Sequence, residues 1–287
     1  MRFVDLHVHS TASDGTFGPT MLVKSAAKCG LSAFALTDHD TVSGIDEAID
    51  AAAKINLEII PGIEISTSYK DKEIHIVGLF IDYHNPDFLK GIGNEIDRRS
   101  KRNEILIEKF NEYGFPITLE ELIAAFPNSV ITRAHFASYM VKKGYVKNNK
   151  EAFDKYLGDG MPLYVPRERK SPDEAIALIK KAGGIAVLAH PLLYHLTMGE
   201  LRDLCRQLIS YGLTGIETMY STYKGFDEQN VRALANELGL LESGGSDFHG
   251  DNKPHIRLGS GMGNLRINYS YLEKLKEAAN SHRQTDN

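Results

Sequence analysis

The sequence predicts an α/β fold, either a (β/α) barrel or an open sheet, that one helical segment interrupts. Short runs rich in Val, Ile and Leu are apolar on both faces, and segments with helical periodicity separate them. No strand pattern occurs between residues 97 and 170, which read as helices only. We therefore expect a barrel formed by residues 1–96 and 171–287, with a small helical domain inserted at residues 97–170.

Seven segments have the character of strands. Because they are mostly apolar on both faces, a parallel sheet that helices cover on both sides suits them. The expected strands are Phe3–Val8, Ala33–Thr37, Leu57–Ile65, Ile74–Ile81, Ile185–Ala189, Gly215–Met219 and Leu240–Ser243.

The helices have recognisable ends. Gly30 follows the first helical pattern as a C-cap, and Ser171-Pro172 opens another with an N-cap and a proline at the first helical position. In the barrel we expect helices at Thr20–Cys29, Ile45–Ala53, 172–181, Met198–Tyr211 and Asp227–Leu238. In the insert we expect Ile96–Tyr113, Leu119–Ala125, Thr132–Lys143 and Lys150–Tyr156.

The composition is that of an ordinary soluble protein, with 42% hydrophobic and 25% charged residues. A net charge of −5 excludes a generic polyanion-coating protein. The two cysteines exclude a disulfide scaffold and fit a reducing cytosol. The sequence shows no targeting segment and no stretch suited to span a membrane. We expect a cytoplasmic protein with no membrane partner and no obligatory protein partner.

The insert differs from the barrel in charge. Residues 97–170 contain 14 Lys and Arg against 10 Asp and Glu, a net charge of +4, whereas the remainder has 19 against 28, a net charge of −9. An acidic body suits metal cations, and a basic insert suits an anionic substrate. Solvated faces of an ordinary helical insert would give the same charge.

Six of the eleven histidines, with three carboxylates, lie mainly at or just beyond the expected carboxyl ends of strands, where α/β barrels place their active sites. His7 and His9 are two apart in one strand and therefore share a face. The nine candidate metal ligands are His7, His9, Asp14, His39, Glu64, His75, His190, Asp247 and His249.

Taken singly, a histidine or aspartate at a strand end is more often a structural residue than a ligand. Burying so many imidazoles and carboxylates together without a cation would be very costly. Since one metal takes four to six protein or water ligands, nine candidates predict two or three divalent ions, with Glu64 bridging. Imidazole and carboxylate ligands suit manganese, iron or zinc, and we favour manganese.

The motifs that carry these ligands resemble the PHP (polymerase and histidinol phosphatase) family of metal-dependent phosphoesterases over nearly the whole chain. They are Asp5-Leu-His7-Val-His9 with Ser13-Asp14-Gly15, Thr37-Asp38-His39-Asp40-Thr41, Pro61-Gly-x-Glu64, His75, Ala189-His190-Pro191 and Gly245-Ser-Asp247-x-His249. Some family members have His at the position of Asp14, and Asp is also a competent ligand. The resemblance implies a distorted (β/α)7 barrel.

The insert resembles the stand-alone branch of that family through Thr132-Arg133-Ala-His135, Gly144-Tyr145 and Pro162-x-Tyr164-Val165. Members of this branch act as nucleoside 3′,5′-bisphosphate phosphatases and as 5′→3′ exonucleases on short RNA or DNA. The family pattern would place His7, His9, Glu64 and Asp247 on a first metal, Asp14, His39 and His249 on a second, and Glu64, His75 and His190 on a third. Asp5, Asp38 and Asp40 would orient the ligating imidazoles.

The resemblance implies a phosphoesterase that hydrolyses nucleoside 3′,5′-bisphosphates, 5′-phosphorylated short oligonucleotides, or both, through a metal-bound hydroxide. A small nucleotide or a short oligonucleotide is then the binding partner. We expect Arg133 to bind a substrate phosphate and to act in catalysis, with His135 and Lys170 as further binding residues. His195 is a candidate acid for the leaving group, with an ordinary loop histidine as the alternative. Tyr164 is a candidate for stacking on a base, although a core position is the more common role for a tyrosine.

Two alternatives remain open from the sequence. One is a small-molecule phosphomonoesterase of the histidinol-phosphate type, against which the basic insert argues. The other belongs to a different class, an inactive module that binds nucleic acid or a protein partner. The presence of all nine candidate ligands argues against the second.

Overall fold

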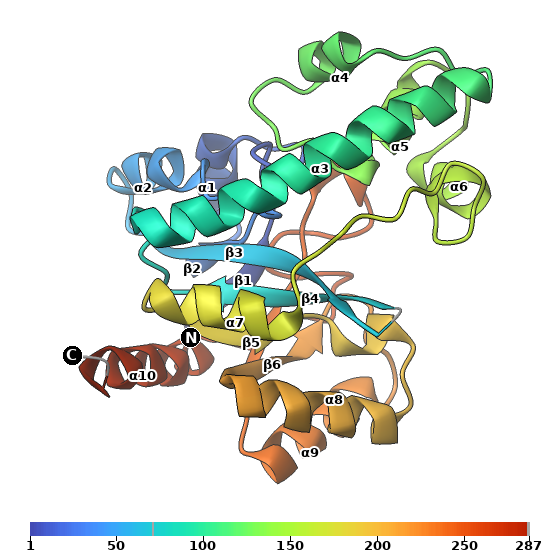
Figure 1. Cartoon of the computed structure of the whole chain (residues 1–287). Coiled ribbons are helices and arrows are strands. Elements are labelled where there is room, and N and C mark those ends of the chain that lie inside the picture. The colour runs from blue at the N-terminus through green and yellow to red at the C-terminus, as the bar shows by residue number, and fades with distance from the viewer. Residues whose placement is uncertain (71, 286–287) are drawn as a thin grey trace.

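The computed structural model describes residues 1–70 and 72–285, and its strands form an almost closed barrel (Figure 1). The sheet order is β7-β6-β5-β4-β3-β2-β1-β8. Beyond β7, the Asp247 amide donates to the His7 carbonyl at 2.9 Å, so this end of the sheet meets β1 and the predicted distorted (β/α)7 barrel is confirmed. The strands are β1 (Phe3–Val8), β2 (Leu31–Leu36), β3 (Glu58–Tyr69), β4 (Lys72–Leu79), β5 (Ile185–Leu188), β6 (Leu213–Tyr220), β7 (Leu241–Gly245) and β8 (Ile267–Asn268).

One strand of the predicted parallel sheet has the opposite direction. β4 pairs antiparallel with both β3 and β5. The connection from Tyr69 to Lys72 is too short for a crossover helix, so the chain turns back as a hairpin. This reversal puts the amino-terminal half of β4, which contains His75, beside the carboxyl-terminal half of β3. The short strand β8, which pairs antiparallel with β1, was not predicted either.

Helices cover both faces of the barrel strands. Leu22, Ile45, Ile176, Leu204 and Val231, one from each of the five covering helices, share one core with residues of the strands. The unpredicted helix α10 packs on the other face through Leu272 and Leu275. The barrel helices are α1 (Pro19–Lys28), α2 (Ile45–Ala52), α7 (Pro172–Lys181), α8 (Met198–Tyr211), α9 (Asp227–Leu238) and α10 (Tyr269–Thr285). In the described part of the chain, no helix is long and apolar enough to cross a membrane.

The insert is joined to the barrel by one long helix, α3 (Pro86–Glu112), which crosses the barrel and ends among the insert helices (Figure 1). Phe88 and Ile92 at its start pack in the barrel core, whereas Leu106 and Phe110 pack in a separate core of the insert. The predicted boundary at residue 97 therefore falls inside a continuous helix. The other insert elements are α4 (Leu119–Ala125), α5 (Arg133–Lys142), α6 (Asn149–Ala152) and a π-helical turn, Phe153–Leu157.

Candidate metal centre

Glu64 of β3 lies at the centre of the predicted ligands, and its two carboxylate oxygens face different imidazoles. Oε1 is 2.8 Å from His75 Nδ1 and 2.9 Å from His190 Nε2. Oε2 is 3.1 Å from His39 Nδ1 and 3.2 Å from His9 Nε2. A carboxylate that faces imidazoles with both oxygens has the arrangement of a bridging ligand.

The structure brings all nine predicted ligands into four overlapping groups, in each of which the ligand atoms lie within 4.8 Å of one another. Asp14 with His39 and His249 forms one group, as the resemblance implies, and His9 joins it. His7 and His9 meet Asp247 in another group, and Glu64 pairs with His75 and with His190 in the remaining two. The group of Asp14, His39 and His249 follows the expected pattern. The other groups follow it in part, because His75 and His190 fall in different groups and four residues are each shared by two groups, namely His7, His9, His39 and Glu64.

The contacts within the site fit bound cations better than direct hydrogen bonds. The Nε2 atoms of His7 and His9 point at each other at 3.1 Å and also face oxygens of Glu64 and Asp247. His9 Nδ1 and Asp14 Oδ1 are buried, neither has a hydrogen-bond partner among the described residues, and they lie 4.0 Å apart. That distance is too long for a hydrogen bond and suits two ligands of one ion. These nitrogen and oxygen donors are those of divalent transition metals.

The protonation states favour ligation in part of the site. Burial opposes ionisation, but the facing histidines hold the pKa values of Asp14 and Glu64 well below their ordinary range, so both carboxylates are anionic. Burial lowers the pKa of His39 to about 3, which leaves its imidazole neutral. For His9, contacts with Asp247 and Glu64 outweigh burial and raise the pKa to about 9. A cation would therefore have to displace a proton there.

A second layer of carboxylates surrounds the ligands, but not as predicted. Asp5 accepts from the Ser246 and Gly259 amides, and Asp38 accepts from Ser10 and Ser13, so both hold loops rather than imidazole rings. Asp40 pairs with Arg99 and Arg167. These aspartates do not orient imidazoles because the folded chain brings main-chain amides, serine hydroxyls and guanidinium groups to them instead.

Glu217 of β6 makes the contact with an imidazole that the sequence predicted for those aspartates. It is buried, its Oε1 lies 2.8 Å from His7 Nδ1, and its Oε2 accepts from the His190 amide at 2.6 Å. With Nδ1 held as a donor, the Nε2 lone pair of His7 faces the metal groups. Sequence reasoning missed Glu217, although a carboxylate inside an otherwise apolar strand was a usable signal.

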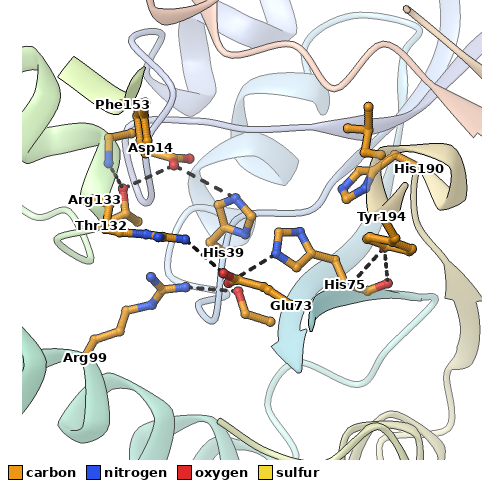
Figure 2. A pocket seen from close by; sticks show the side chains of 13 residues that line it. Asp14, His39, Glu73, His75, Arg99, Thr132, Arg133, Phe153, His190 and Tyr194 are labelled. Atoms are coloured by element: carbon orange, nitrogen blue, oxygen red, sulfur yellow. Dashed lines mark hydrogen bonds and ion pairs between the residues drawn. The ribbon is translucent and has the colours of Figure 1, made fainter. Parts of the chain in front are cut away.

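A cavity of about 310 Å³ opens beside the ligands (Figure 2). His39, His75 and His190 lie on its barrel side, and Arg99 and Arg133 reach it from the insert and its connecting helix. Arg133 pairs with Glu73 and Asp159 at 2.9 Å each. Arg99 pairs with Asp40 and lies 3.4 Å from Ser66 Oγ. The cavity therefore joins three imidazoles and the Asp14 carboxylate of the candidate metal site to a pair of fixed cations.

The other predicted substrate residues do not line this cavity. The His135 ring is buried, and its Nδ1 accepts from the Thr132 amide in a capping box at the start of α5. Lys170 lies 3.5 Å from Glu95, and His195 is exposed outside the cavity. Tyr164 supports Arg133, whose guanidinium carbon is 5.4 Å from the ring centroid.

Arg99 and Glu73 complete the cavity wall, and sequence reasoning missed both. Glu73 is two residues before His75 in the same strand, so period-2 alternation could have placed it on the same face. Arg99 had no comparable signal, because it is one of several basic side chains in α3 and the sequence does not distinguish it from the exposed ones, such as Lys90 and Lys101.

Comparisons with known proteins agree with this geometry. The family model of the PHP domain matches residues 5–161. A 5′-3′ exoribonuclease of Haemophilus influenzae is 40% identical over 85% of this chain and 89% of its own length. The 5′-3′ exoribonuclease Rnm of Escherichia coli is 35% identical over 89% of this chain and 87% of its own. A 3′,5′-nucleoside bisphosphate phosphatase of Chromobacterium violaceum is 34% identical over 87% and 88%.

Two solved structures superpose on nearly the whole fold. One, from Bifidobacterium adolescentis and described as a metal-dependent phosphoesterase, has a TM-score of 0.86 and 30% identity over 96% of this chain and 95% of its own. The other, described as an amidohydrolase from Chromobacterium violaceum with bound sulfate and no metal, has a TM-score of 0.86 and 32% identity over 96% of both chains. With the family model, the relatives and the arrangement of the nine ligands in agreement, the chain belongs to the PHP family of metal-dependent phosphoesterases.

Proposed function

We propose that this enzyme hydrolyses nucleotide-type phosphate esters, namely nucleoside 3′,5′-bisphosphates, 5′-phosphorylated short oligonucleotides, or both. One observation carries the proposal: a single cavity is lined both by four of the candidate ligands and by two arginines, Arg99 and Arg133. The four ligands are Asp14, His39, His75 and His190. Both substrate types present a 5′-phosphorylated nucleoside with a further phosphate on its 3′ side. One phosphate would lie at the metal groups and the other at the arginines.

The arginines suit the phosphate that is not cleaved. The Arg133 guanidinium is held by Glu73 and Asp159 and backed by Tyr164, so little side-chain entropy is lost when it binds. A guanidinium can hold phosphate through two parallel hydrogen bonds. Arg99 lies deeper, 7% exposed, and its pair with Asp40 fixes it against β3. Binding by these two residues would orient the ester toward the ligands.

Divalent ions, when bound, lower the pKa of a water nucleophile and neutralise charge that develops on the phosphoryl oxygens. The chain supplies the holders: Glu64 at the centre, with His7, His9 and Asp247 to one side. Asp14, His39 and His249 lie on another side, and His75 and His190 on a third. We propose two or three ions, with manganese as the favoured metal because the donors are imidazoles and carboxylates.

We also propose that the enzyme acts in the cytoplasm without an obligatory protein partner. The two cysteines support a reducing compartment: both are free, Cys29 exposed and Cys205 buried. The inactive-module alternative is weakened by the convergence of all nine ligands. The histidinol-phosphate alternative is weakened by Arg99 and Arg133 in the cavity wall, because a small monoester has no second phosphate for these arginines to bind.

The test is product analysis with the manganese-reconstituted protein. Adenosine 3′,5′-bisphosphate and a 5′-phosphorylated RNA oligomer are offered side by side, with chelated protein as the control. Phosphate release from the bisphosphate alone would identify a small-molecule nucleotide phosphatase. Stepwise release of mononucleotides from the 5′ end would identify an exonuclease. If neither substrate reacts while a simple phosphomonoester does, the proposed substrate class is wrong.

The residue assignment has its own test. Arg133→Ala should raise KM for the bisphosphate more than KM for a simple phosphomonoester, since only the bisphosphate has a second phosphate to bind. Removal of one charge-assisted contact corresponds to roughly ten- to hundredfold in kcat/KM. Unchanged turnover of the bisphosphate by this variant would contradict the assignment.

A further inference from the structure

The mouth of the cavity has an apolar part that the proposed phosphate chemistry does not use. Among the described residues that line the cavity, Ala134, Phe153 and Leu193 have purely hydrocarbon side chains. Leu193 is 42% exposed, and Phe153 is partly buried against the core of the insert. Phe153 comes from the insert and Leu193 from the barrel, so the apolar surface spans the junction of the two parts.

Phe153 is displayed by an unusual local structure. It is the first residue of the π-helical turn Phe153–Leu157. Such turns are rare in proteins, and those that occur are often found at functional sites. The turn is anchored below by Leu157, which is fully buried, and by Tyr156, whose ring packs edge-on against Phe115 at 5.2 Å. The turn closes where the Gly158 amide donates to the Phe153 carbonyl at 2.9 Å. A Cβ at position 158 would lie 2.7 Å from that oxygen, so the closure requires glycine.

Leu193 is displayed in a similar way on the barrel side. It lies in the 3-10 turn Pro191–Tyr194, between His190 and His195, which both have positive φ angles, of 27° and 52°. Its neighbour Tyr194 is buried, and the Tyr194 hydroxyl donates to the Ala189 carbonyl at 2.6 Å. Such backbone strain persists only where the surroundings fix it. An exposed leucine on a fixed, strained turn beside the ligand His190 indicates a surface that contacts a ligand.

We propose that this apolar mouth binds the nucleobase of the substrate, with the base stacked on Phe153 and contacting Ala134 and Leu193. The inference rests on the proposed function and adds to it the part of the substrate that the metal groups and arginines leave unbound. Because these three side chains offer no hydrogen-bonding group, the base would be held by its face and not by its edge. All four bases should therefore be accepted within a few-fold. Phe153 takes the place that the sequence gave to Tyr164, which instead supports Arg133.

The test compares substrates with and without a base. Phe153→Ala should lower kcat/KM for adenosine 3′,5′-bisphosphate about tenfold, within the range for loss of one base–aromatic stack, and should leave ribose 3,5-bisphosphate unchanged. Phe153→Trp should restore the value for the nucleotide. Ile105→Ala is the matched control, because Ile105 is an exposed apolar residue of α3 that does not line the cavity. An equal loss for both substrates, or no loss for either, would overturn the inference.

A binding measurement separates this inference from the proposed function. The fluorescence of 2-aminopurine riboside 5′-monophosphate should be quenched on binding to the metal-loaded wild-type protein, and the quenching should be lost with Phe153→Ala. If the wild type cleaves neither bisphosphate but quenches through Phe153, the proposed reaction fails and the base site stands. If it cleaves the nucleotide without any quenching that depends on Phe153, the base site fails and the reaction stands.

Discussion

At the scale of single residues, we predict that Glu64 bridges the metal ions, because its two oxygens face different imidazoles. Glu64→Gln keeps the shape but leaves one oxygen and no charge among five imidazole contacts. Loss of a residue that only hydrogen-bonds to a metal ligand already reduces metal affinity or activity by up to ~100-fold. Loss of the ligand Glu64 itself should therefore reduce metal affinity and turnover by more than ~100-fold. Metal analysis and kinetics on Glu64→Gln and on the same-strand control Glu58→Gln measure this. Retention of metal and activity by Glu64→Gln would refute the bridging role.

The contact between Glu217 and His7 predicts a milder defect. In Glu217→Gln, an amide group must face either the His7 Nδ1 donor or the His190 amide, and one of the two contacts becomes a clash of donors. Mutation of a residue that orients a metal ligand in this way typically lowers metal affinity by ~10- to 100-fold. Manganese titration followed by electron paramagnetic resonance gives the affinity directly. Glu242→Gln on the neighbouring strand is the control, and unchanged affinity in Glu217→Gln would mean that Glu217 only supports the fold.

His135, which is not one of the candidate metal ligands, predicts a pH dependence of stability. Burial lowers its pKa to about 4, below the ~6.5 of the unfolded chain, so folding favours the neutral ring. Its contribution to the free energy of unfolding is full above pH ~6.5 and declines as the pH falls toward 4, with ~2 kcal/mol lost at pH 5. His135→Gln keeps the capping acceptor and removes the titration. Urea unfolding of chelated protein at pH 8 and pH 5 should show a smaller decline in the variant, and equal declines would contradict this role.

These residues also show how far the sequence could predict the site. Most of the nine candidate ligands lie at or just beyond the carboxyl ends of strands, and residue type and position were enough to predict that the nine would gather at one site. Glu217 and Arg99 act on groups that are 210 and 59 residues away along the chain, and only the folded structure brings them together. His195 follows a ligand closely in sequence, but the strained turn leaves it exposed outside the cavity. Proximity in the sequence was a poor guide there, and the role of His195 stays a prediction.

At the scale of elements, hydrophobic periodicity predicted the seven main strands and the barrel helices other than α10 to within a few residues. It could not predict the direction of β4, because an apolar strand reads the same in either direction and the direction depends on the length of the connection. The two-residue strand β8 was too short for any periodicity. The helix α3 extends well before its predicted start, since Pro86 with the Asn85 cap begins it ten residues before Ile96, where the sequence predicted the helix to start.

Two glycine-to-alanine substitutions, one where β7 packs against β1 and one in α3, should have opposite effects on the free energy of unfolding. A Cβ at Gly245 would lie 2.3 Å from His7 Cβ and 2.5 Å from its main-chain nitrogen. Gly245→Ala should therefore separate the strands, cost ~1–3 kcal/mol as overpacking and displace His7 from its metal group. Gly93→Ala in α3 meets nothing within 4 Å and should stabilise the protein by ~0.5–1 kcal/mol. Urea unfolding and manganese affinity measure both, and normal metal binding by Gly245→Ala would show that β1 adapts to the added methyl group.

At the scale of the whole molecule, the barrel and the insert have separate cores but meet at the metal centre. Thr132 donates to Asp14 at 3.2 Å, and the Val130 amide donates to the Ala12 carbonyl at 2.9 Å, so the start of α5 rests on the loop that carries a ligand. The acidic barrel and the basic insert predicted from the sequence therefore meet where an anionic substrate would bind. The composition predicted this division of charge, and the cavity is lined by residues of both the acidic barrel and the basic insert.

Removal of the metals should test this architecture as a whole. Ions at ~1000-fold excess over their dissociation constant add ~4 kcal/mol to the folded state, and chelation should lower Tm by roughly 5–10 °C. The loss should be local, because the ligands at His9, Asp14, His39 and His249 lie on connections that the ions tie together, whereas the insert core at Phe110 and Phe136 contains none of them. Hydrogen exchange should therefore accelerate in residues 9–15, 37–41 and 246–252 and stay slow in α3 beyond residue 103. Added manganese should reverse the change, and uniform acceleration across barrel and insert would mean that the two parts unfold as one unit.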